Sequence, residues 1–224
     1  MSPLKDNRVA LVFGATGLVG RYLVNELLDN RQYSSIEVFV RKSIHPDRPK
    51  IREHVIGFDR LDDWAPMVKG DDLFICLGTT IRKAGSVRRV EEIDRDLPVG
   101  LAALACANGV KRIAVVSSMG ADPRSRNYYL RIKGEMEEGI RKLPFDQIII
   151  ARPSMLFGER NEFRFGELIG TIVMKAIGFL LIGSARKYRG IHGRTVASAM
   201  IELLGSTRQK EVFLSDELQE VGKK

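Results

Sequence analysis

The chain has 224 residues, of which 44% are hydrophobic and 29% are charged. This length and balance predict one globular domain over residues 1–224. The net charge is +8, but the basic residues are scattered along the chain. Nucleic-acid-binding proteins usually cluster their basic residues, so this scatter argues against nucleic-acid binding and favours a surface suited to anionic small molecules.

Two cysteines, Cys76 and Cys106, lie in apolar contexts and cannot form a disulfide framework. We therefore expect reduced core cysteines in a cytoplasmic protein. The first eight residues are polar and charged, so we expect no secretion signal. The three histidines are isolated in the sequence, and no metal site is expected.

A glycine-rich stretch, RVALVFGATGLVG, spans residues 8–20. Its apolar run 9–13 predicts a buried strand, and an amphipathic helix is predicted over residues 18–30. A strand that turns sharply into a helix directs unpaired backbone N–H groups and the positive end of the helix dipole at one point, which suits a phosphate. The alternative is a tight turn without a ligand. The predicted cofactor loop comprises Gly14, Ala15, Thr16, Gly17, Leu18, Val19 and Gly20.

A second strand is predicted at 36–40, and Arg41 and Lys42 follow it. In a dinucleotide-binding fold, the end of the second strand meets the adenosine ribose, where arginine accommodates a 2′-phosphate. The pair therefore favours NADP(H) over NAD(H). A solvated pair at a strand end is the alternative.

Two further strands are predicted at 55–58 and 73–77. Asp59, directly after the first of these strands, is either a helix N-cap or an acceptor for the adenine amino group. Gly78 follows the other strand, where a small residue leaves room for the cofactor. Its neighbours Leu77 and Thr79 are included in the predicted cofactor site.

A helix over 91–108 and strands at 112–116 and 146–151 continue the alternation. Within the helix, Pro98 marks either a kink or a late start. Strands that alternate with helices predict an α/β fold with a doubly wound parallel sheet of the Rossmann type.

A helix predicted over 127–142 carries Tyr129 and Lys133, four residues apart and so on one face. A lysine ammonium beside a phenol stabilises the phenolate and makes it a usable proton donor or acceptor. Ser117 and Ser118 follow the fifth strand, and a hydroxyl there can polarise a substrate carbonyl. We assign Ser118, Tyr129 and Lys133 to catalysis and Ser117 to the cofactor, although either serine could be the operative one.

Five segments together resemble one family: GATGLVG, LGTTIRKAG, SSMGAD, YLRIKGEME and LPFDQIIIARPSMLFGER. The chain resembles atypical short-chain dehydrogenase/reductases of the Tat-interacting protein oxidoreductase branch. The resemblance implies a Ser118–Tyr129–Lys133 triad, NADP selection by Arg41 and an adenine contact at Asp59. It also implies that the nicotinamide is lined by Pro153, Ser154, Met155 and Leu156. The serine–tyrosine separation is shorter than in many relatives.

Residues 158–194 break the alternation and predict a short lid or substrate segment, or a subunit contact. The strongly apolar stretch 163–183 is interrupted by Lys175 and glycines, so we expect no integral membrane span. An interfacial membrane helix is an alternative. A helix is predicted over 195–204, and 214–224 is expected to be a frayed tail.

These features predict an NADP(H)-dependent oxidoreductase that acts on a carbonyl or alcohol group of a small molecule. Arg82, Lys83 and Arg88 would suit an anionic substrate. The alternative is an NADP(H)-sensing regulatory protein that binds protein partners with little or no turnover. The sequence leaves open the substrate, the direction of reaction, and whether the chain is a homodimer or a monomer.

Overall fold

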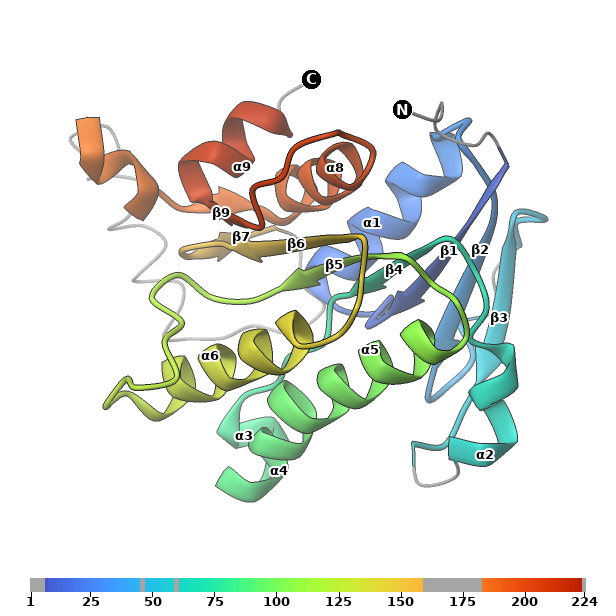
Figure 1. Ribbon diagram of the computed structural model, residues 1–224, viewed down its shortest axis with the longest axis horizontal. Coiled ribbons are helices and arrows are strands. Elements are labelled where there is room, and N and C mark those ends of the chain that lie inside the picture. Colours follow the sequence, from blue (N-terminus) through green and yellow to red (C-terminus); the bar gives the residue numbers. More distant parts are fainter. Residues whose placement is uncertain (1–6, 45–46, 59–60, 159–182, 223–224) are drawn as a thin grey trace.

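The computed structural model describes residues 7–44, 47–58, 61–158 and 183–222. Its centre is a seven-stranded sheet in the order β3-β2-β1-β4-β5-β6-β9, in which every neighbouring pair is parallel (Figure 1). The strands are β1 (Arg8–Phe13), β2 (Tyr33–Val40), β3 (Ile51–Val55), β4 (Asp72–Ile75), β5 (Arg112–Val116), β6 (Gln147–Arg152) and β9 (Val212–Leu214). This confirms the doubly wound, Rossmann-type α/β fold.

Helices cover both faces of the sheet, and the alternation of side chains along β1 shows why (Figure 1). Ala10 and Val12 belong to one apolar core, whereas Leu11 and Phe13 belong to the other. Each face therefore has its own apolar layer, as expected for a parallel sheet buried on both sides. The first layer contains α1 (Leu18–Asp29), α8 (Gly193–Leu204) and α9 (Ser215–Val221), and the second contains α5 (Leu97–Ala107) and α6 (Tyr128–Arg141).

The direction of winding reverses between β1 and β4, because β2 pairs with one edge of β1 and β4 with the other. Ligands of such sheets bind in the crevice beyond the carboxyl ends of the strands at this reversal. Short elements surround this end of the sheet: α3 (Ile81–Ala84), α4 (Val87–Glu91), a π-helical turn (Glu92–Asp96), and the small parallel pair β7 (Leu156–Phe157) and β8 (Ile191–His192).

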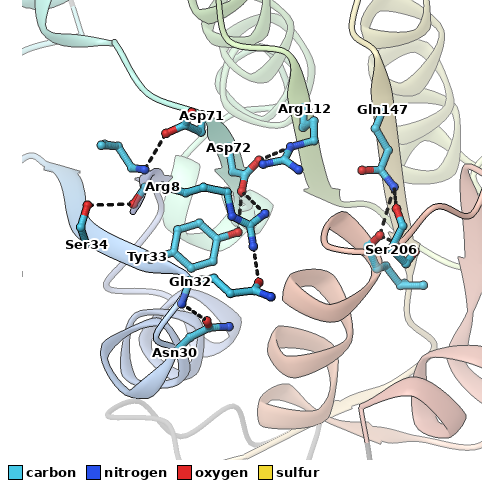
Figure 2. A network of polar contacts seen from close by, with 12 residues as sticks. Arg8, Asn30, Gln32, Tyr33, Ser34, Asp71, Asp72, Arg112, Gln147 and Ser206 are labelled. Carbon is cyan, nitrogen blue, oxygen red and sulfur yellow. Dashed lines mark hydrogen bonds and ion pairs between the residues drawn. The ribbon is translucent and has the colours of Figure 1, made fainter. Parts of the chain in front are cut away.

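A buried polar network joins four strands at the opposite, amino end of the sheet (Figure 2). The Asp72 carboxylate accepts hydrogen bonds from the Arg8 guanidinium at 3.0 Å and from the Tyr33 hydroxyl at 2.6 Å. The Arg112 Nε lies 2.6 Å from the same carboxylate. Arg8 and Asp72 are fully buried, so each charge depends on its partner for compensation.

Two expectations about strands and helices were wrong. The third strand was expected at 55–58, but it is β3 and ends at Val55. Its ladder to β2 runs from Ile36↔Ile51 to Val40↔Val55. The apolar residues 55–58 therefore mostly follow this edge strand. The expected frayed tail instead begins with the end of β9 and continues as α9, which buries Ser215 and Leu218 completely.

A short helix, α2 (Leu61–Trp64), follows β3. Among the described residues, no helix is long and apolar enough to cross a membrane. Most of the expected lid, 158–194, lies outside the described residues, as does the apolar stretch on which the interfacial-helix alternative rested. The lid and the single-domain organisation stay predictions.

Candidate active site

The turn from β1 into α1 is built on close backbone approaches. Gly14 has a φ of +86°, and a Cβ there would lie 2.6 Å from the Cys76 carbonyl carbon and oxygen. A Cβ on Gly20 would lie 2.0 Å from the Gly14 carbonyl oxygen. Only glycine fits either position without a shift of the backbone.

The start of α1 is open to an anion. Its N-cap residue is Gly17, which has no side chain to accept from the first-turn N–H groups, and the first turn contains no acidic residue. Partial positive charge therefore gathers at this end of the helix without a protein counter-charge at the cap or in that turn. This is the arrangement that binds a phosphate.

Two adjoining cavities, of about 530 and 490 Å³, lie beside this turn. The first continues toward the end of β5 and the start of α6, whereas the second continues along the end of β2 and the π-helical turn. The expected site residues that line at least one of them are Gly14, Ala15, Thr16, Gly17, Leu18, Val19, Arg41, Leu77, Gly78, Thr79, Ser117, Tyr129, Lys133 and Leu156.

Arg41 is exposed at the end of β2 and lines both cavities. Phe39, Val40 and Phe58 line the second cavity with it and give that end an apolar wall. A planar ring bound there would meet apolar groups on its faces and a guanidinium at its edge. This combination suits an adenosine that carries a phosphate.

Tyr129 and Lys133 both line the first cavity, from the first and second turns of α6. Tyr129 is 41% exposed, whereas the Lys133 side chain is buried. The Lys133 ammonium forms an ion pair with a carboxylate oxygen of Asp94 at 2.7 Å. Burial is the largest single influence on the pKa of Lys133 and acts to lower it, but Asp94, Tyr129 and Glu137 together outweigh burial, so this pKa lies above its ordinary value.

The serine pair after β5 divides between two environments. Ser117 is buried, lines the first cavity and donates its hydroxyl proton to Glu137 at 2.5 Å. The Arg152 guanidinium in turn holds Glu137 through contacts of 2.8 and 2.5 Å. Ser118 lines neither cavity, and its hydroxyl donates a long hydrogen bond of 3.4 Å to the Met119 carbonyl.

Several expected site residues lie away from the cavity walls. Gly20 packs behind the loop, and Lys42 is exposed but lines neither cavity. Asp59 lies outside the described residues. Ser154 is held by α9, since its N–H donates to the Ser215 hydroxyl at 2.7 Å. Pro153 and Met155 also lie outside both linings, so Leu156 alone of that segment reaches the cavity.

Two buried carboxylates beside the site, Asp94 and Glu137, were not foreseen. Each interrupts the apolar stripe of a helix: Asp94 precedes Leu97 and Leu101, and Glu137 precedes Ile140. A charged residue on the buried face of a helix requires a partner, and this signal could have identified both. Of the basic residues expected to suit an anionic substrate, Lys83 lines both cavities and Arg82 and Arg88 line neither, whereas Arg89, which was not expected there, lines the second cavity.

The chain matches known proteins along most of its length. Residues 14–175 match a family model described as NAD(P)H-binding. Protein HTATIP2 of Rattus norvegicus is 34% identical over 224 residues, which covers 97% of this chain and 90% of that protein. Protein FMP52, mitochondrial, of Candida glabrata is 36% identical over 166 residues, covering 72% of this chain and 69% of that protein.

Solved structures support the same fold. ADP-L-glycero-D-manno-heptose-6-epimerase of Helicobacter pylori superposes with a TM-score of 0.68 at 14% identity, covering 97% of this chain and 82% of that one. MoeE5 in complex with UDP-glucose and NAD gives a TM-score of 0.65 at 16% identity, covering 94% and 79%.

The residues present fit a dinucleotide cofactor, because a glycine cradle, an uncapped helix start and an exposed arginine border two adjoining cavities. The resemblance to atypical short-chain dehydrogenase/reductases is thereby confirmed at the level of fold and family. The chain belongs to the NAD(P)H-binding Rossmann family that includes HTATIP2 and FMP52.

Proposed function

We propose that this protein is an NADP(H)-dependent oxidoreductase that interconverts a carbonyl and an alcohol on a small molecule. The observation that carries this proposal is the placement of Tyr129 and Lys133 on the same cavity as the glycine turn. A protein that only binds a dinucleotide has no need of a tyrosine and a buried, charged lysine at that place. The bound cofactor would supply or accept the hydride.

The Tyr129 hydroxyl would exchange a proton with the substrate oxygen, and the Lys133 ammonium would stabilise the phenolate form. Ser117 is better placed than Ser118 to hydrogen-bond the substrate oxygen, because Ser117 lines the cavity. Since Ser117 donates its proton to Glu137, its oxygen is set to accept a hydrogen bond from a substrate hydroxyl. To donate to a carbonyl, the Ser117 hydroxyl must first rotate away from Glu137.

The preference for NADP(H) is proposed from Arg41. Its guanidinium lies at the end of β2, the place where this fold meets the 2′ position of the adenosine ribose. A guanidinium forms strong charge-assisted hydrogen bonds with a phosphate and gains little from a neutral hydroxyl. Asp59 as an adenine contact also stays a prediction.

An anionic substrate is proposed from Lys83, which lines the same cavity as Tyr129. The cytoplasmic location expected from the cysteines likewise stays a proposal, and the word mitochondrial in the name of the FMP52 relatives applies to those proteins. A homodimer is compatible with these features and is not required by them.

Turnover with a matched tyrosine pair tests the proposal. Oxidation of NADPH would be followed with a panel of neutral and anionic carbonyl compounds for wild type, Tyr129→Phe and Tyr128→Phe. Tyr128 is the neighbouring tyrosine, and its hydroxyl donates to the Val87 carbonyl at 2.8 Å instead of lining the cavity. We expect Tyr129→Phe to lower kcat by about 100-fold or more, the scale of a lost proton-transfer group.

Tyr128→Phe should stay close to wild type. Equal losses in the two variants would contradict the role of Tyr129. Tight NADPH binding with no turnover on any carbonyl compound would contradict the enzyme and favour the regulatory alternative.

A further inference from the structure

Asp94 occupies an unusual place in the chain, in the middle of the π-helical turn that joins α4 to α5. Its carboxylate is fully buried. One oxygen pairs with the Lys133 ammonium at 2.7 Å, and the other accepts a hydrogen bond from the Thr79 backbone N–H at 2.9 Å. π-helical turns are rare and widen a helix locally, which is how this side chain is directed at two groups outside its own helix.

Both oxygens of Asp94 are used, and both face donors. An asparagine in this place could accept from Lys133 or from Thr79, but its amide NH2 would then face the other donor. A carboxylate is therefore the group that satisfies both partners at once. Its negative charge also compensates an ammonium whose side chain is only 3% exposed.

The charge state of Lys133 depends on this compensation. Burial favours the neutral amine, whereas nearby negative charge favours the ammonium. Lys133 faces Asp94 from the π-helical turn, and Tyr129 and Glu137 from its own helix. The Glu137 charge is already engaged by Arg152 and Arg141. The other charged groups on the wall of this cavity are the cations Arg21, Arg41 and Lys83, which oppose the ammonium.

We propose that Asp94 is a positioning residue with two effects: it keeps the buried Lys133 charged, and it ties Lys133 to the cofactor-side turn at Gly78 and Thr79. Thr79 lines both cavities, so one carboxylate joins the cofactor wall to the lysine of the proposed catalytic helix. The proposal deepens the proposed function, but its first effect is a property of the folded chain that exists without cofactor or substrate.

The first test measures the protonation of Lys133 directly. NMR of protein with 13C-labelled lysine follows each side chain as the pH is raised, and Lys133→Met identifies the Lys133 signal. In wild type this signal should stay in the ammonium form through the range in which ordinary lysines titrate. In Asp94→Asn it should titrate at least about two pH units lower than in wild type, as expected for a lysine buried without a counter-charge.

Asp96→Asn is the matched control, because Asp96 ends the same π-helical turn but is exposed and pairs with Arg95 at the surface. It removes the same charge and should leave the Lys133 titration unchanged. Asp94→Glu restores the carboxylate and should recover at least part of the ammonium. Equal titration of Lys133 in wild type and Asp94→Asn would overturn the proposal. If Asp94→Asn does not fold, the wild-type signal decides, since a Lys133 that titrates below ordinary lysines is incompatible with the proposal.

The second test measures NADPH affinity by calorimetry in two alanine variants. Asp94→Ala removes the acceptor of the Thr79 N–H and should raise the Kd for NADPH about tenfold, whereas Asp96→Ala should leave it unchanged. Equal affinity in all three proteins would refute the tie to the cofactor wall. Absence of NADPH binding in wild type would instead refute the proposed function, while the lysine titration would still test the charge of Lys133.

Discussion

Replacement of Gly20 with alanine tests the close approach on which the cofactor turn depends. The added methyl group would lie 2.0 Å from the Gly14 carbonyl oxygen and 2.7 Å from its carbon. Both atoms belong to the backbone, so the first turn of α1 must move by about 1 Å to relieve the overlap. Such overpacking costs about 1–3 kcal/mol, of which the better helix propensity of alanine recovers up to about 1 kcal/mol.

The same displacement moves the N–H groups of the helix start away from a bound phosphate. Loss of one charge-assisted hydrogen bond corresponds to about a 10- to 100-fold increase in the Kd for NADPH. Urea unfolding gives the change in the free energy of unfolding, and calorimetry gives the affinity. Gly20→Ala should therefore lower both stability and affinity.

Gly100→Ala is the control for this experiment. Gly100 also lies inside a helix, but a Cβ there would have no neighbour within 4 Å. This variant should be more stable by up to about 1 kcal/mol, with unchanged NADPH affinity. If Gly20→Ala behaves like Gly100→Ala, the close approach does not constrain the turn and the reasoning is refuted.

Four further predictions concern other parts of the molecule. Asp72→Asn should lower the free energy of unfolding by about 3–5 kcal/mol, because it leaves the buried Arg8 without its counter-charge; a loss below about 1 kcal/mol in urea unfolding would contradict this. Lys50→Met should cost about 1 kcal/mol in the same assay, since this ammonium donates to three carbonyls at the end of α1; unchanged stability would count against that cap. Gly134→Ala should destabilise by about 1–3 kcal/mol because its Cβ would lie 2.3 Å from backbone atoms of the loop before α6, and a thermal midpoint equal to wild type would disprove the contact. Burial raises the pKa of Cys76 to about 12, so iodoacetamide should leave this thiol unmodified at pH 8; rapid labelling by peptide mass spectrometry would contradict that.

The sequence predicted the elements whose signals are local. The apolar run before Gly14, the helix that carries Tyr129 and Lys133, and the alternation of strands and helices were sufficient for the fold and family. Residues at strand ends were also predictable, since parallel strands bring their carboxyl ends to one edge. Arg41 and Gly78 reached the cavities for this reason.

Features that depend on long-range partners could not be predicted in the same way. Asp72 looks like part of a polar turn in the sequence, yet it starts β4 and is buried against Arg8 and Tyr33 (Figure 2). The bond from Ser117 to Glu137 joins a residue that directly follows β5 to one on α6, and no local pattern connects the two. The tail was misjudged because β9 is only three residues long and is stabilised by its pairing with β6.

Calorimetric binding of NADPH, NADP, NADH and NAD to wild type and Arg41→Ala tests whether this chain holds a dinucleotide and whether Arg41 selects NADP(H). Arg52→Ala serves as a control, because Arg52 is a largely exposed cation on β3 outside both cavities. We expect wild type and Arg52→Ala to bind NADPH about 10- to 100-fold more tightly than NADH, and Arg41→Ala to lose this difference. Equal affinity of wild type for the two reduced cofactors would contradict NADP selection by Arg41, and no binding of any dinucleotide would contradict the proposed site altogether.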